Sequence, residues 1–70
     1  MLKRRLTNKV KTFRVLAKDM TQSELGELVG VTRQTIAAIE SGKYSPSLEC
    51  AFRIAEVVGQ PLQEVFHWEK

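Results

Sequence analysis

Residues 21–49 read TQSELGELVGVTRQTIAAIESGKYSPSLE, and this stretch carries the clearest helix signals of the chain. Thr21, followed three residues later by Glu24, forms a capping-box pattern that begins a helix. Gly30 suits the left-handed backbone conformation in which a helix commonly ends. The pattern therefore predicts a helix over about 22–29.

The second half of the stretch predicts another short helix after a tight link. Thr32 is a good N-cap for a helix over Arg33–Glu40, and only Val31 and Thr32 separate it from Gly30. Gly26 has no side chain to push the two helices apart where they cross. The apolar residues that would hold this pair on a core are Leu25, Val29, Val31, Ile36 and Ile39. Two helices joined in this way form the helix-turn-helix pattern, and this pattern makes DNA binding a candidate function.

The segment before the stretch predicts a first amphipathic helix over about 7–18. Its apolar residues recur at three- and four-residue spacing, and its lysines occupy the outer face. The expected inward residues are Val10, Phe13, Leu16 and Ala17.

The segment after the stretch predicts two more helices. Ser47 caps one over Leu48–Val58, which Gly59 ends, and Pro61 fits the first turn of a short helix that runs through Phe66. The expected apolar stripe of the fourth helix is Leu48, Ala51, Phe52, Ala55 and Val58. The tail 67–70 has no clear period, and no segment alternates strongly enough to predict a strand with confidence.

The spacing of these residues resembles the Cro and phage-repressor type of helix-turn-helix, the XRE family of small prokaryotic regulators. The resemblance covers about 13–66, and the matching residues are Gln22, Leu25, Gly26, Val29, Gly30, Val31, Ile36 and Ile39. It implies an all-α, compact five-helix repressor-like domain with the helix-turn-helix at its second and third helices. Some small members add terminal strands, which here would pair Leu2–Arg5 with Phe66–Glu69.

One position departs from the family pattern. Members commonly carry an Arg in the first helix, five residues before the place of Met20, that pairs with a Glu matching Glu40. This position is Val15, and Arg14 lies one residue earlier. Either the loop after the first helix absorbs an extra residue, or the pair with Glu40 is absent.

The resemblance implies that the helix 33–40 enters the major groove of DNA with its N-terminal side chains at the base edges. The expected base contacts are Arg33, Gln34, Ala37 and Ala38. An Arg fork fits guanine, a Gln amide fits adenine, and the alanines offer methyl contact or close approach. The expected phosphate contacts are Gln22, Ser23, Thr32, Thr35, Lys43 and Tyr44. Thr32 is a cap first, and Lys43 is equally suited to the dipole at a helix C-terminus.

The 70 residues carry a net charge of +3 and predict one domain over 1–70, with the motif at about 21–41. Residues 1–20 carry 7 − 1 = +6 and residues 21–70 carry 4 − 7 = −3. This asymmetry suggests contact with a polyanion. The basic arm 1–6, with Lys3-Arg4-Arg5, has three open interpretations: a DNA-touching arm, a pairing strand or a disordered tail.

The leading hypothesis is a sequence-specific transcriptional regulator, a repressor by its resemblance, that binds a pseudo-palindromic double-stranded DNA operator as a homodimer. The expected dimer residues are Leu62, Val65, Phe66 and Trp68. The alternative is an antitoxin or adaptor whose main partner is another protein.

Other functional classes are poorly supported. One His, one Cys and one Asp leave no nucleophile–base pair, so we expect no enzyme, cofactor, metal site or small-molecule substrate. Cys50 is interpreted as a small half-buried residue. The longest uncharged run is far shorter than the roughly 20 residues of a membrane span. We therefore expect a cytoplasmic protein.

Overall fold

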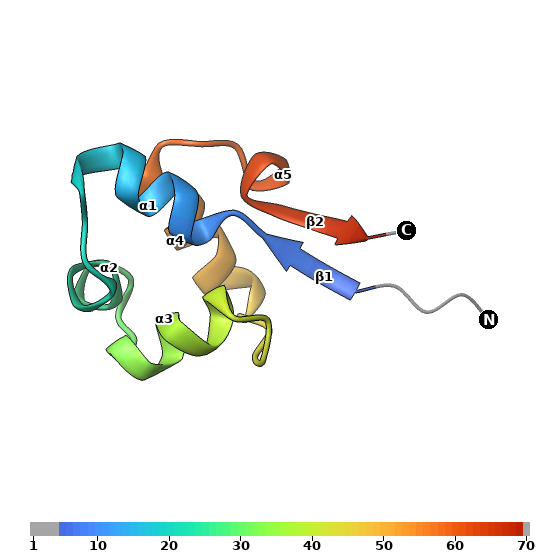
Figure 1. The fold of residues 1–70 in the computed structure, drawn as a ribbon, viewed down its shortest axis with the longest axis horizontal. Helices are drawn as coiled ribbons and strands as arrows, with labels where there is room; N and C mark the ends of the chain where they lie inside the picture. Colours follow the sequence, from blue (N-terminus) through green and yellow to red (C-terminus); the bar gives the residue numbers. More distant parts are fainter. Residues whose placement is uncertain (1–4, 70) are drawn as a thin grey trace.

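The computed structural model describes residues 5–69, which form five helices and a two-stranded sheet. The elements in chain order are β1 (Arg5–Asn8), α1 (Val10–Lys18), α2 (Gln22–Val29), α3 (Arg33–Glu40), α4 (Leu48–Val58), α5 (Leu62–Val65) and β2 (Phe66–Glu69). The helices gather into a bundle, from which the two strands project as a ribbon (Figure 1). The all-α fold with a small terminal sheet is confirmed. No helix within residues 5–69 is long and apolar enough to cross a membrane.

The helices α2, α3 and α4 have the bounds and the caps predicted from the sequence. The Thr21 hydroxyl accepts a bond from the Glu24 amide at 3.0 Å, and the Glu24 carboxylate accepts one from the Thr21 amide at 2.8 Å. These two bonds complete the capping box, and they hold the pKa of Glu24 below its ordinary value. Gly30 ends α2 with φ 83°, in the left-handed region that glycine adopts readily.

The core lies between the helix-turn-helix and α4. Its largest fully buried side chains are Leu25, Ile36, Ile39, Ile54, Val10 and Val65. The predicted apolar stripe of α4 is partly wrong, because Leu48 and Phe52 are 70% and 55% exposed. The helix instead turns Ile54 inward together with Cys50, so its buried face is rotated from the expected one. Two large apolar side chains of α4 are thereby left at the surface.

The helix α1 starts later than predicted, at Val10 rather than near Thr7. The Asn8 side-chain oxygen accepts a bond from the Val10 amide at 3.1 Å, which fixes the start of the helix. The inward face also differs: Leu16 is 73% exposed, whereas Arg14 is only 8% exposed. Val10 is buried, and Phe13 packs against the core as expected.

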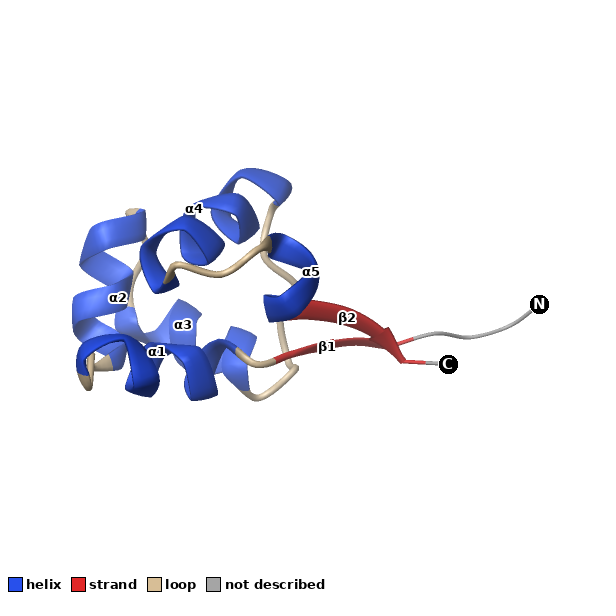
Figure 2. Ribbon diagram, turned by 90° about the horizontal axis from the view of Figure 1, so that it is seen from above, coloured by secondary structure: helices blue, strands red, loops and turns tan. Residues whose placement is uncertain are grey.

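The ribbon joins the two ends of the described chain. Strand β1 pairs antiparallel with β2, with Arg5 opposite Glu69 and Leu6 opposite Trp68. Figure 2 shows both strands leaving the bundle together, beyond α5. The expected second strand, Phe66–Glu69, is confirmed, but the first lies about three residues later than the proposed Leu2–Arg5.

The proposal for the N-terminal segment falls partly outside the described residues. Arg5 belongs to β1, while Lys3 and Arg4 of the basic arm lie outside residues 5–69. The tail 67–70, which has no clear period in sequence, lies largely in β2. The fifth helix also ends one residue early, at Val65, because Phe66 already has extended backbone and begins β2.

Candidate nucleic-acid interface

The helices α2 and α3 approach closely at Gly26. A Cβ atom at this buried position would lie 2.7 Å from the Val31 carbonyl oxygen and 3.2 Å from the Thr32 carbonyl carbon. Both neighbours are backbone atoms of the turn, so a side chain could not be accommodated by a simple rotamer change. The absence of a side chain at Gly26 therefore sets the angle at which α3 leaves the turn.

A buried ion pair fixes the C-terminal end of α3 on the bundle. Arg14 donates from Nε to Oε2 of Glu40 at 2.7 Å and from its terminal nitrogen Nη2 to Oε1 at 3.1 Å. Its other terminal nitrogen donates to the Met20 carbonyl at 2.6 Å, and Gln22 donates to Glu40 Oε1 at 3.0 Å. The guanidinium of Arg14 thus connects three parts of the bundle, namely α1, the loop that precedes α2, and the end of α3.

This network decides between the two alternatives for the register of the first helix. The Arg14–Glu40 pair is present, and the extra residue is absorbed where α1 ends. Asp19 has φ 52°, in the left-handed region, and its amide bonds to the Val15 carbonyl. This non-glycine left-handed turn shortens the path to Met20, so Arg14 keeps its partner although it lies one residue earlier.

Asn8 forms a second link to α3 that sequence reasoning missed. Its Nδ2 donates to the Ile39 carbonyl at 2.9 Å, while its Oδ1 accepts from the Val10 amide at 3.1 Å. The carbonyls of the last helical turn have no partner further along their own helix. Asn8 therefore provides a hydrogen-bond partner both for a carbonyl in the last turn of α3 and for the first amide of α1. The only signal in the sequence is the preference of Asn for helix starts.

The residues expected at the base edges lie together on α3. Arg33 and Gln34 are exposed in its first turn, and Ala37 and Ala38 are half-buried one turn later. Ile36 and Ile39 point the other way into the core. The exposed side of α3 thus presents two long polar side chains. One turn later it carries two small alanines, which let another molecule approach the helix closely.

The residues expected at phosphates surround this surface. Gln22 and Ser23 form the first turn of α2, and the Thr32 and Thr35 hydroxyls lie 3.1 Å apart at the start of α3. Lys43 and Tyr44 follow α3, are exposed, and donate their amides to the Ala38 carbonyl. The half-buried Gln22 side chain donates one amide hydrogen to Glu40, and its Nε2 carries a second hydrogen that this bond does not use.

Two further cations share a side of α1 with Arg14. Lys11 and Lys18 lie three residues before and four residues after it, which places them on neighbouring positions of one helix face. Both are exposed, whereas Arg14 turns inward to Glu40. Lys11 and Lys18 therefore place exposed positive charge on α1 beside the buried Arg14.

The residues expected at a dimer contact divide into two groups. Val65 is completely buried and bonds through its carbonyl to the Lys9 amide at 2.8 Å, so its expected contact with a second copy is wrong. Leu62 and Phe66 are half-buried against the core, and Trp68 is 62% exposed. These three residues remain available at the surface.

The single described cysteine is buried at the start of α4. Burial raises the pKa of the Cys50 thiol, opposed in part by the charge of Arg53. The raised pKa lowers the fraction of reactive thiolate, in keeping with the interpretation of Cys50 as a small residue that packs in the protein and does not act as a redox switch.

Comparison with known proteins agrees with this geometry. The family described as Helix-turn-helix matches residues 10–65. An uncharacterized HTH-type transcriptional regulator of Methanocaldococcus jannaschii is 47% identical over 64 residues, which cover 91% of this chain and 96% of that protein. The regulator YgzD of Bacillus subtilis, also uncharacterized, is 46% identical over 65 residues, covering 93% and 97%.

A phage protein is a more distant relative. The cryptic phage CTXphi transcriptional repressor RstR of Vibrio cholerae is 34% identical over 59 residues, which cover 84% of this chain and 52% of that protein. The family match to residues 10–65 spans α1 through α5 and includes every residue discussed on α2 and α3. The chain therefore belongs to the helix-turn-helix family of transcriptional regulators, which are DNA-binding proteins and not enzymes.

Proposed function

We propose that this chain is a repressor that binds a pseudo-palindromic operator in double-stranded DNA as a homodimer, with α3 in the major groove. The observation that carries the proposal is the exposed first turn of α3, whose far end is fixed by Arg14 and Asn8. A helix that reads bases must be held rigidly, because small displacements break bidentate bonds. The likeness to RstR, itself named a repressor, supports the direction of regulation.

The residues of α3 take different roles in this proposal. Arg33 bonds O6 and N7 of a guanine and Gln34 bonds N6 and N7 of an adenine, the pairings that their donor geometry favours. Ala37 and Ala38 allow the helix to lie deep in the groove and contact thymine methyl groups. Specificity therefore rests on a small, nearly neutral surface.

The surrounding residues position the domain on the phosphates. The amides at the start of α2, with Gln22 and Ser23, face one backbone segment, because helix N-termini attract anions. The Thr32 and Thr35 hydroxyls and the Lys43–Tyr44 turn contact the backbone on either side of α3. Lys11 and Lys18 add attraction that depends on salt and not on base sequence.

Selection from random duplex DNA, followed by binding titrations, tests the reading surface. Arg33→Ala or Gln34→Ala should each weaken the selected site by about 1–3 kcal/mol and relax preference at one base pair. Lys43→Ala should weaken all sequences alike and lower the salt slope by about one unit. Gln60→Ala, which changes an exposed glutamine between α4 and α5, is the matched control and should leave the selected sequence unchanged.

Two outcomes would contradict the proposal. Unchanged base preference in both Arg33→Ala and Gln34→Ala would show that α3 does not read the bases. Selection that yields no preferred sequence for the unaltered chain would show that its binding is not specific. Either result leaves the fold and the family membership intact.

A further inference from the structure

An apolar groove runs between the start of α4 and the terminal ribbon. It has a volume of about 420 Å³, and its apolar lining consists mainly of Leu6, Pro46, Leu48, Leu62, Phe66 and Trp68. Leu48 is 70% exposed and Trp68 is 62% exposed. Large apolar side chains gathered in one place on a small protein mark an interaction surface.

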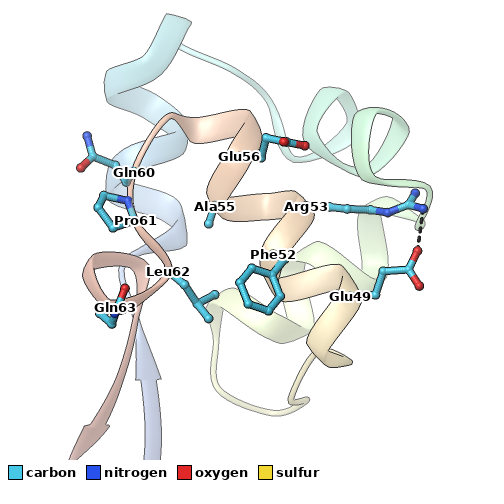
Figure 3. Close-up of a pocket in the computed structure, with 9 residues that line it drawn as sticks. All are labelled: Glu49, Phe52, Arg53, Ala55, Glu56, Gln60, Pro61, Leu62 and Gln63. Atoms are coloured by element: carbon cyan, nitrogen blue, oxygen red, sulfur yellow. Dashed lines mark hydrogen bonds and ion pairs between the residues drawn. The ribbon is translucent and has the colours of Figure 1, made fainter.

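The groove continues the apolar surface of α4. Leu62 lines both this groove and a neighbouring hollow, in which it lies beside Phe52 (Figure 3). The neighbouring hollow has a charged rim of Glu49, Arg53 and Glu56, with Arg53 bonded to Glu49 at 2.6 Å. The groove is different, because none of the described residues that line it is Asp, Glu, Lys or Arg. Its occupant is therefore apolar, and neither nucleic acid nor an anionic surface fits it.

The ribbon itself is incomplete as an isolated unit. A two-stranded sheet is marginally stable in water unless another element covers it. Leu6 lies opposite Trp68, and Phe66 lies two residues before Trp68, so these three side chains share one face of the ribbon. All three line the groove, and His67 lines it as well. The apolar face borders the groove, so one partner can cover both features.

The distance between the ribbon and the expected base-contacting residues of α3 favours a second copy of this chain as the partner. Gln34 lies five residues before Ile39, or about 8 Å along the axis of α3. Asn8 bonds Ile39, and the four residues of β1 extend about 13 Å further. In Figure 1 both α3 and the ribbon lead toward the end of the molecule where the chain termini lie, each inclined to the long axis. The ribbon therefore extends up to about 21 Å from Gln34, a reach that includes about 17 Å, half of the spacing between half-sites in a two-fold dimer.

We infer that this groove and the apolar face of the ribbon form the two-fold contact with a second copy of this chain. The inference rests on the proposed function for its half-site geometry and adds the location of the interface. A two-fold contact uses the same patch on both protomers, and this patch is apolar on each. Leu48 and Trp68 of one protomer enter the groove of its partner. The contact therefore includes Leu6 and Leu48, which lie outside the C-terminal segment first considered.

The test compares two equally exposed leucines by sedimentation velocity over a range of concentrations. Leu48→Glu places a carboxylate in the groove, and Leu16→Glu places one on α1, where Leu16 is 73% exposed. Both change the net charge equally. Glu suits the first turn of α4, so Leu48→Glu should fold. We expect Leu48→Glu to raise the dimer dissociation constant at least tenfold and Leu16→Glu to change it less than twofold.

Trp68→Ala is a second variant that adds no charge and should also weaken the dimer at least tenfold. Circular dichroism confirms that each variant is folded. Dimerisation as strong as that of the unaltered chain in both Leu48→Glu and Trp68→Ala would overturn the inference. Equal weakening in Leu16→Glu would do so as well.

Binding to duplexes with one or two half-sites separates this inference from the proposed function. An unaltered chain that selects its half-site but stays monomeric, both free and on the two-site duplex, would overturn the interface and leave the reading function standing. A chain that dimerises through Leu48 but selects no sequence would overturn the proposed function and support the interface.

Discussion

Asn8 shows how one side chain can join elements from both ends of the chain. It ends β1, caps the first amide of α1 and donates to a carbonyl in the last turn of α3. Asn8→Ala removes both bonds and leaves two half-buried backbone groups without this partner. We expect the free energy of unfolding to fall by about 1–3 kcal/mol, from two bonds that each contribute roughly 0.5–1.5 kcal/mol. Urea denaturation measures the change.

The neighbouring residue provides the control. Thr7 makes one long bond, from its hydroxyl to the His67 carbonyl at 3.4 Å. Thr7→Ala should therefore cost less than half as much as Asn8→Ala. Equal losses would mean that Asn8 stabilises the ribbon in general and does not anchor α3.

Several residue environments could not have been predicted from local sequence. Apolar spacing alone assigned Leu48 and Phe52 to the core and overlooked Ile54, because a rotation of α4 about its axis depends on what packs against it. Arg14 was a clearer case, since its partner Glu40 lies 26 residues away. The pair forms although Arg14 lies one residue early, because the left-handed turn at Asp19 absorbs the extra residue. Caps and glycine stops depend on neighbouring residues, and for this reason α2 and α3 were predicted to the residue.

At the scale of elements, the crossing of α2 and α3 depends on Gly26. In an ordinary helix interior, replacing Gly with Ala stabilises by roughly 0.5–1 kcal/mol. Here the new Cβ would lie 2.7 Å from the Val31 carbonyl oxygen. We therefore expect Gly26→Ala to destabilise the fold by about 1–3 kcal/mol, the usual cost of overpacking. Thermal unfolding measures this change, and a stabilised variant would show that the crossing has room to open.

The same substitution should affect DNA binding more than stability. Opening the crossing rotates α3 relative to α2, so the two helices can no longer contact bases and phosphates together. Below the unfolding transition, Gly26→Ala should lose preference for the selected site while its non-specific binding persists. Preference equal to that of the unaltered chain would show that the angle between α2 and α3 does not control recognition.

The ribbon was the hardest element to predict, since each strand has only four residues and its partner lies at the other end of the chain. Neither strand has a turn signal of the kind that identifies a hairpin. Its second strand was suggested by the resemblance alone. The candidate base-contacting residues on α3 were easier to propose, because the capped helix and its inward isoleucines leave one exposed face.

At the scale of the whole molecule, the proposed interface must hold the two α3 helices at the spacing of the two half-sites. In the proposed dimer, two-fold partners joined at their ribbons would hold their α3 helices about one DNA turn apart. Inserting about half a turn, roughly five base pairs, between the half-sites moves the second site to the opposite face of the duplex. We expect the unaltered chain to lose at least tenfold in affinity for this duplex. Leu48→Glu should bind each half-site independently and show no dependence on spacing, which electrophoretic mobility titrations can measure. If both proteins ignored the insertion, the ribbons would not fix the distance between the two reading helices.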